Sequence, residues 1–276
     1  MPTPTPTPNL IPTTAQATPA PAVIAHVSDI HIVARDEDDG RSIARTRAVM
    51  EYLNDLPYDL DAIIVTGDIA DHGTPAEYEE ARKLLVSRHP LLTCPGNHDE
   101  RGAFREHLLG EAPTTSPINQ SYSTDRFTLA LCDTSVPGKH HGTLTDETLT
   151  WLSDTLAAAP PTRPALIAFH HPPVDLHTPY VDEIRQFDES RLAELTTRHP
   201  NITAFLAGHA HTPAATTFAD RPLLVAPGVT STLRLPWEHQ THPTHHIHQD
   251  LPPALAFHVL NPAGRLTTHY RPIPLP

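Results

Sequence analysis

The sequence predicts an α/β or α+β layered domain. From residue 22 onward, short apolar runs alternate with amphipathic segments, and strands that alternate with helices pack in layers. The chain has 32 prolines among its 276 residues, which excludes an all-helical bundle because proline breaks helix interiors. This length is enough for one large domain with a substantial core, which we place at residues 22–276.

Residues 1–21 are predicted to form an extended, disordered tail. They hold seven prolines among threonines and alanines and almost nothing apolar to bury, and such composition does not support a packed core. The segment also lacks the charged and apolar regions of a secretion signal.

Six apolar runs are predicted to be buried strands, namely 22–27, 61–66, 91–94, 127–133, 164–170 and 202–208. Each is too short for a helix and is bounded by turn residues. Later segments, TTFAD, PLLVAP, ALAFHVL and residues 265–271, resemble strands with no helices between them. We therefore expect a mixed sheet, or a second sheet packed on the first.

Four helices are predicted between the strands, because apolar side chains recur at helical spacing. The third is entered through Thr145, with two acidic residues in its first turn that favour the helix dipole. The fourth starts at Asp188. The core-facing residues are Ile43, Met50 and Leu53 in the first, Tyr78, Ala81 and Leu85 in the second, Leu149, Leu152 and Leu156 in the third, and Leu192 and Leu195 in the fourth.

Composition excludes several classes of protein. The net charge is −13 and no stretch of Lys and Arg forms a basic stripe, so a nucleic-acid polymer is not the expected partner. No apolar run approaches the roughly 18 residues of a membrane span. The two cysteines, Cys94 and Cys132, lie in apolar stretches and give no disulfide framework, which favours a reducing, cytoplasmic location.

Almost every predicted strand ends in a polar cluster. In order these are SDIHI (28–32), GDIAD (67–71), PGNHDE (95–100), HHPP (170–173) and GHAH (208–211). Ligands bind beyond the carboxyl ends of strands in layered α/β sheets, so the clusters are expected to converge. They contain metal-binding residue types, namely Asp29, His31, Asp68, Asn97, His98, His170, His209 and His211.

The spacing of these residues supports metal ligation. Asp29 and His31 are two residues apart, as are His209 and His211, so on an extended chain each pair would point the same way. A carboxylate such as Asp68 can bridge two metals about 3.5–4 Å apart. The glycines before Asp68, Asn97 and His209 permit tight turns beside a crowded site.

In this order the motifs DxH, GDxxD, GNHD, a histidine after a strand and GHxH resemble the calcineurin-like metallophosphoesterase superfamily over residues 22–211. The segments GNHDER (96–101), CDTSVPGKHHG (132–142) and HHPP look like class III 3′,5′-cyclic-nucleotide phosphodiesterases of bacteria, and closest to the actinobacterial kind. The resemblance implies a four-layer αββα sandwich of two mixed sheets flanked by helices, with two metals at the sheet edge. It also implies a homodimer.

Carried over by motif, the resemblance assigns Asp29, His31 and His211 to the first metal and Asp68 to both. Asn97, His170 and His209 would hold the second. It implies in-line attack on phosphorus by a metal-bridging hydroxide, with Asp68, Asn97 and His98 as catalytic residues. Nitrogen and oxygen ligands without thiolate suit iron or manganese, with zinc or cobalt as alternatives.

Several residues near the motifs are weighed for contacts with substrate or for a structural role. His98 would contact the phosphate or protonate the leaving alkoxide, and Asn97 would share in substrate binding. Arg101 would bind phosphate or nucleotide, or else pair with a nearby acid. His141 would contact substrate, or belong with His140 to a solvated loop. His171 is expected to face away from its neighbour and to form a structural or outer hydrogen bond.

The sequence thus predicts a dinuclear phosphodiesterase acting on cyclic nucleotides or similar phosphodiesters. The alternatives are a glycerophosphodiesterase or broad-specificity phosphatase of the same superfamily, a nuclease that the acidic charge disfavours, and a non-catalytic metal-binding module. The segment 238–250 contains five histidines. We interpret it as a flexible surface loop, although its composition also permits metal recruitment.

Overall fold

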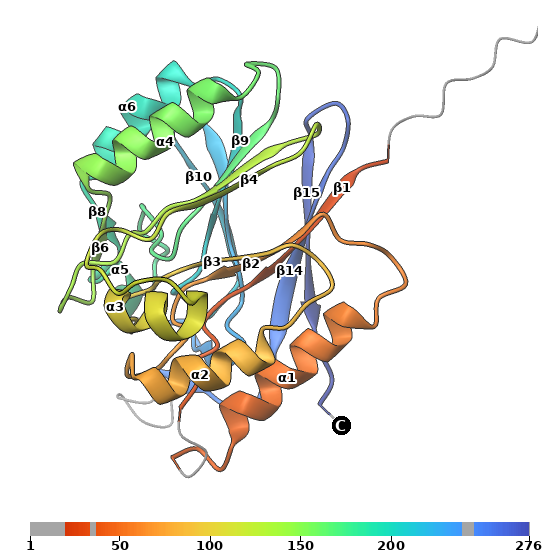
Figure 1. Ribbon diagram of the computed structural model, residues 1–276, viewed down its shortest axis with the longest axis vertical. Helices are drawn as coiled ribbons and strands as arrows, with labels where there is room; N and C mark the ends of the chain where they lie inside the picture. Colours follow the sequence, from red (N-terminus) through yellow and green to blue (C-terminus); the bar gives the residue numbers. More distant parts are fainter. Residues whose placement is uncertain (1–19, 34–36, 239–245, 276) are drawn as a thin grey trace, which may run out of the picture.

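The computed structural model describes residues 20–33, 37–238 and 246–275. Two β-sheets face each other across the centre of the molecule (Figure 1). The first has the order β15-β14-β1-β2-β3. Its strands are β1 (Ala22–Val27), β2 (Ala62–Thr66), β3 (Leu91–Cys94), β14 (Ala254–Leu260) and β15 (Leu266–Pro272). The pairs β1-β2 and β2-β3 are parallel, whereas β14 runs antiparallel to both of its neighbours.

The second sheet has the order β10-β11-β9-β7-β5-β4. Its four central strands are parallel and the two outer ones are antiparallel to their neighbours. The strands are β4 (Gln120–Ser123), β5 (Thr128–Leu131), β7 (Ala165–Ala168), β9 (Ile202–Ala207), β10 (Ala214–Phe218) and β11 (Arg221–Val225). All six predicted early strands are present, and β10, β11, β14 and β15 correspond to the four later segments.

Helices cover the outer face of each sheet, which gives the four-layer αββα sandwich (Figure 1). The helices α1 (Arg41–Asn54) and α2 (Pro75–Leu84) pack on the first sheet, and α4 (Asp146–Ala158) and α6 (Glu189–Arg198) pack on the second. The apolar layer between the sheets includes Ile24, Ile64, Leu129, Leu166 and Leu206. The predicted fold is confirmed.

Local sequence explains where α2 and α4 begin. Thr74 and Glu77 form a capping box at the start of α2, with Pro75 in the first turn, and each feature satisfies or avoids an unpaired backbone N–H. The Thr145 side chain accepts a hydrogen bond from the Thr148 N–H and caps α4 as expected. The last predicted core residue of α2, Leu85, lies at its C-cap.

The sequence patterns missed several short elements. The edge strand β4 has an alternating, partly exposed sequence, QSYS, which is too polar and short to register as an apolar run. The other short elements are α3 (Arg101–Ala103), the π-helix η1 (Phe104–Leu109), α5 (Pro179–Asp182), β6 (Gly142–Thr143), β8 (Gln186–Phe187), β12 (Thr232–Leu233) and β13 (Ile247–His248).

Two predicted features fall wholly or partly outside the described residues. These are the N-terminal tail, of which only residues 20 and 21 are described, and the histidine-rich segment, of which residues 239–245 are not. Among the described residues, no helix combines the length and apolar character needed to cross a membrane.

Candidate metal centre

The polar clusters after five strands meet at one edge of the sandwich. Asp29 and His31 follow β1, Asp68 follows β2, Asn97 and His98 follow β3, His170 follows β7, and His209 and His211 follow β9. The pairs β1-β2, β2-β3 and β7-β9 are parallel, so within each sheet these carboxyl ends share an edge. The loops of the two sheets touch there, where the His209 N–H donates to Asp29 Oδ2 at 3.1 Å.

The backbone is left-handed rather than extended at these positions. Five side chains of the centre belong to non-glycine residues with φ between 41° and 69°, namely Asp29, His31, Asp68, His209 and His211. Each such conformation costs on the order of 1–3 kcal/mol and persists only where surrounding contacts enforce it. The expectation of an extended chain was therefore wrong. The side chains of each pair are brought together by turning the backbone after each strand.

The first group of donors comes from Asp29, His31 and His211. His31 Nε2 and His211 Nε2 are 3.2 Å apart, and His211 Nε2 lies 3.5 Å from Asp29 Oδ1. Asp68 Oδ2 lies 3.4 Å from His31 Nε2. These four side chains place two imidazole nitrogens and two carboxylate oxygens around one small volume.

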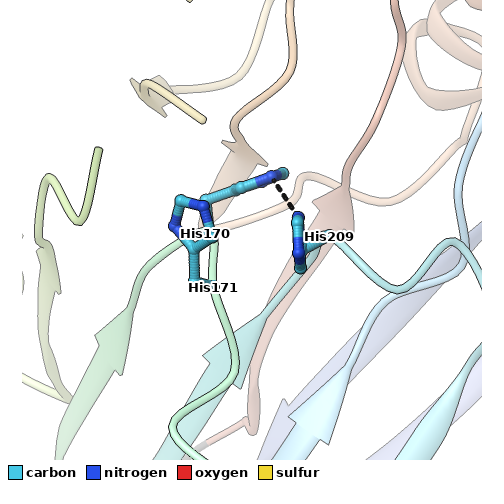
Figure 2. A group of neighbouring side chains, drawn as sticks. All are labelled: His170, His171 and His209. Atoms are coloured by element: carbon cyan, nitrogen blue, oxygen red, sulfur yellow. Dashed lines mark hydrogen bonds between the residues drawn. The ribbon is translucent and has the colours of Figure 1, made fainter. Parts of the chain in front are cut away.

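The second group comes from Asn97, His170 and His209. His170 Nε2 lies 3.2 Å from Asn97 Oδ1 and 3.1 Å from His209 Nδ1, the contact drawn in Figure 2. The same His170 nitrogen is 3.3 Å from Asp68 Oδ2. Asp68 Oδ2 therefore borders both donor groups, as a bridging carboxylate would.

The outer hydrogen bonds of three histidines fix which ring nitrogen is free. His31 Nδ1 lies 2.7 Å from Asp71 Oδ1, and His170 Nδ1 lies 2.7 Å from the Thr66 carbonyl. His211 Nδ1 lies 2.9 Å from Ser231 Oγ and 3.3 Å from the Ser231 carbonyl. Carboxylates and carbonyls only accept, so each Nδ1 carries the hydrogen and each Nε2 presents a lone pair inward.

These inward lone pairs fit divalent cations. Several acceptors converge with no hydrogen between them, and Asp29 Oδ1 is buried without a hydrogen-bond partner among the described residues. Buried acceptors are costly unless paired, and outer partners of this kind orient imidazoles toward metals. Nitrogen and oxygen donors without thiolate suit first-row transition metals.

The pKa shifts of Asp68 and His170 also favour a cation at this position. Burial opposes ionisation of Asp68, but the charge and hydrogen bond of His170, together with the charges of His31 and His98, hold the pKa of that carboxyl well below its usual range. Burial likewise opposes protonation of His170, yet Asp68 raises the pKa of this imidazole to about 9. Positive charge is therefore favoured beside Asp68, where a metal would supply it in place of the proton.

Two glycines allow the loops to approach this closely. A Cβ at Gly67, whose φ is 81°, would lie 2.5 Å from His170 Nδ1, and a Cβ at Gly96 would lie 2.2 Å from Asp68 Oδ1. Both distances are well inside contact, so any larger residue would displace a donor.

Two aspartates inside the predicted motifs support the donors, although the sequence patterns assigned them no role. Asp99 accepts hydrogen bonds from the N–H groups of Ile69, Ala70 and Gly96 and from the Tyr78 hydroxyl, and so joins the loops after β2 and β3. Asp71 orients His31, and its carbonyl lies 2.7 Å from His98 Nδ1. Their position in GDIAD and PGNHDE was the available signal.

The donors open into a cavity of about 650 Å³, a size typical of small-molecule sites. His98 lines it, with 37% of its side chain exposed. Further lining residues include Arg41, His140, Tyr180, Ile184, His246 and Ile247. The rings of Tyr180 and His246 are nearly parallel, with centroids 5.9 Å apart.

The structure places two residues that the sequence offered as substrate contacts, Arg101 and His141, outside the lining of the cavity. The buried guanidinium of Arg101 pairs with Asp133 at 2.8 Å and donates to the Ser135 carbonyl. This arrangement matches the second alternative, in which Arg101 pairs with a nearby acid. His141 packs against Phe187, and its neighbour His140 lines the cavity instead. The prediction for Arg101 relied on its position directly after the GNHDE motif, and the prediction for His141 relied on the resemblance of its loop to related enzymes.

His171 lies beside His170 and His209 in Figure 2 but makes other contacts. Its Nδ1 is 2.8 Å from Thr134 Oγ1 and its Nε2 is 3.1 Å from the His140 carbonyl. Both ring nitrogens are thus used in hydrogen bonds, as expected for a structural role. The ring does not face away from its neighbour, however, because its centroid lies 4.8 Å from that of His170 and 4.7 Å from that of His209.

Residues 22–213 match the model of the calcineurin-like phosphoesterase family. The chain belongs to this family. It is 36% identical over 210 residues to a probable cyclic nucleotide phosphodiesterase of Rhodococcus erythropolis, covering 74% of this chain and 69% of that protein. It is 33% identical over 226 residues to a glycerophosphodiester phosphodiesterase of Enterobacter lignolyticus, covering 79% of this chain and 80% of the relative.

A third relative is a cAMP/cGMP dual specificity phosphodiesterase of Mycobacterium tuberculosis, 35% identical over 217 residues, which cover 74% of this chain and 66% of the relative. The calcineurin-like fold is also seen in a dimetal phosphatase from Danio rerio. That structure superposes with a TM-score of 0.61 at 13% identity, over 93% of this chain and all of the other.

Proposed function

We propose that the protein is a dinuclear metal-dependent phosphodiesterase that hydrolyses 3′,5′-cyclic nucleotides or related small phosphodiesters. One observation carries the proposal: two groups of nitrogen and oxygen donors share Asp68 Oδ2, which lies 3.4 Å from His31 Nε2 and 3.3 Å from His170 Nε2. The cyclic-nucleotide relatives support the substrate class.

The assigned roles follow the two groups. Asp29, His31 and His211 would hold one ion, and Asn97, His170 and His209 would hold the other, with Asp68 bridging. Bound ions would lower the pKa of water and polarise the phosphoryl group. Iron or manganese is proposed, with zinc or cobalt as alternatives, because the donors include no thiolate.

His98 is proposed to act on the phosphate without binding metal. Its Nδ1 donates to the Asp71 carbonyl at 2.7 Å, which leaves Nε2 facing the site; in the imidazolium form, Nε2 would carry the second proton and would give it to the leaving alkoxide. The backbone N–H of His98 donates to Asp68 Oδ1 at 3.0 Å, which fixes this histidine beside the metal-binding side chains. Asn97 is proposed to share in holding the phosphate.

The cavity wall supports a substrate with a flat organic part. Tyr180 is 57% exposed and Ile247 is 54% exposed, and both line the same cavity as the donors, together with Ile184 and His246. Aromatic and aliphatic side chains offer a nucleobase a stacking surface that glycerol does not need. Of the two neighbouring histidines His140 and His141, we propose His140 as a substrate contact, because it lines the cavity.

The proposal is tested with the metal-stripped protein reloaded with Mn²⁺. Hydrolysis of bis(p-nitrophenyl) phosphate is expected, and cyclic AMP is expected to be hydrolysed faster than p-nitrophenyl phosphate at equal metal load. A strong preference for the monoester would contradict the proposal. Absence of turnover with any transition metal would favour a non-catalytic metal-binding module.

A glycerophosphodiesterase is the second candidate, favoured by the 80% coverage of the Enterobacter relative. It predicts that a glycerophosphodiester outcompetes cyclic AMP and that the Tyr180→Ala variant leaves its turnover unchanged. A homodimer and a cytoplasmic location are further proposals; both cysteines are free and buried, in keeping with a reducing compartment. Sedimentation of the holoenzyme tests the dimer.

A further inference from the structure

Four polar side chains cross the apolar layer between the two sheets. His26 of β1, His258 of β14, Thr66 of β2 and Ser28 are each 0% exposed. In the strand register His26 lies beside Ile64 and His258 lies beside Ile24, two members of the apolar cluster between the sheets. Burial of polar groups in such a layer is costly unless every one is hydrogen-bonded. Their hydrogen bonds form one continuous chain.

The direction of the chain can be deduced from its inner end. Ser28 Oγ donates to the Thr66 carbonyl at 3.0 Å, which uses its single hydrogen, so it accepts from Thr66 Oγ1 at 2.8 Å. The Thr66 hydroxyl must then accept from His26 Nε2 at 2.8 Å. It follows that His26 Nδ1 accepts from His258 Nε2 at 3.0 Å, and His258 Nδ1 accepts from Thr268 Oγ1 at 2.8 Å.

Every donor therefore points from β15 toward the metal centre, and such aligned bonds polarise one another. The chain ends on the Thr66 carbonyl, which also accepts from His170 Nδ1 at 2.7 Å. That bond fixes which nitrogen of His170 faces Asp68 and Asn97. Ser28 follows the last residue of β1 and Thr66 is the last residue of β2, just before the turns that carry Asp29 and Asp68.

We propose that His26 and His258 are positioning residues for the second metal. They lie outside the donor groups and act by holding the Thr66 and Ser28 hydroxyls, which in turn hold the carbonyl that orients His170. The inference rests on the proposed metal centre. Outer partners of metal-binding histidines change affinity about 10- to 100-fold, and His26 is further removed, so we expect a loss of about tenfold in affinity for one of two ions.

The test is Mn²⁺ titration of the metal-stripped protein by calorimetry, with EPR of the loaded protein. His26→Leu removes the donor to Thr66, and Thr66→Val removes the hydroxyl while keeping shape and carbonyl. Each variant is expected to bind one of the two ions with about tenfold lower affinity. Its EPR spectrum is expected to shift from the signal of a coupled Mn²⁺ pair toward that of isolated ions. The double variant is expected to lose no more than either single one, because both break the same chain.

His89→Leu is the matched control. His89 is also buried and accepts a hydrogen bond, from the Leu60 N–H, but it lies outside the chain, so both ions are expected to bind as in wild type. Unchanged Mn²⁺ affinity in folded Thr66→Val protein, or an equal loss in the control, would overturn the inference. Wild-type protein that binds fewer than two ions would overturn the proposed function itself, and this inference with it.

Discussion

Acidification is expected to destabilise the protein through its buried histidine pair. His258 is 0% exposed in β14 and hydrogen-bonded at both ring nitrogens. Burial lowers its pKa to about 3, and burial together with His258 lowers the pKa of His26 well below its ordinary value. In the unfolded chain both imidazoles titrate near their ordinary pKa of about 6.5.

The magnitude follows from proton linkage. A group whose pKa is lowered by folding contributes stability that is present above the unfolded pKa and is lost as the pH falls toward the folded pKa. Between pH 6.5 and 3, unfolding takes up one proton on His258, so the free energy of unfolding falls by up to about 1.4 kcal/mol per pH unit. At pH 5 His258 alone accounts for a loss of about 2 kcal/mol.

Urea unfolding of metal-stripped protein between pH 7.5 and 5, followed by circular dichroism, measures this loss. The His258→Leu variant is expected to be less stable at pH 7.5, but its stability is expected to fall about 2 kcal/mol less by pH 5. His269→Gln, at an exposed position of β15, keeps the buried pair and serves as the control. Parallel pH dependences in wild type and His258→Leu would refute the reasoning.

Four further predictions concern the centre and its cavity. Asp68→Asn is expected to remove the shared charge and to lower bound metal below two ions per chain, measured by elemental analysis. His98→Ala is expected to reduce turnover about 10²- to 10⁴-fold with both ions retained; loss of an ion would show that its role is misassigned. Asp99→Ala leaves four buried donors unpaired, so urea unfolding is expected to show a loss of about 3 kcal/mol or more. Tyr180→Ala is expected to raise KM for cyclic AMP while leaving that for a dialkyl phosphate unchanged; equal changes for both substrates would argue against stacking.

The strands and the order of the motifs could be predicted because they depend on local chemistry. Apolar runs such as 22–27 and 202–208 have no stable place except a buried strand, and the turn residues after them mark where each ends. The polar edge strand β4 carries no such signal, since its formation depends on pairing with β5.

The conformation of the site loops was beyond sequence reasoning. In the extended backbone that was predicted from the sequence, side chains two residues apart point the same way, yet Asp29 and His211 adopt a left-handed backbone conformation. Contacts between loops enforce it, such as the His209 N–H on Asp29 Oδ2. Residue type gave candidate ligands, but only the fold decided which nitrogen of each imidazole faces inward.

By itself, the sequence predicted a layered α/β domain and the list of candidate metal ligands, because strand burial and ligand chemistry are properties of short segments; the order of the motifs added the resemblance that implied the αββα sandwich. Tertiary structure alone decided that Arg101 pairs with Asp133 rather than lining the cavity, and that His140 rather than His141 faces it. It alone also joined His26 to His258 across 232 positions of the chain. Such pairings depend on which elements fold against each other, and no local pattern records that.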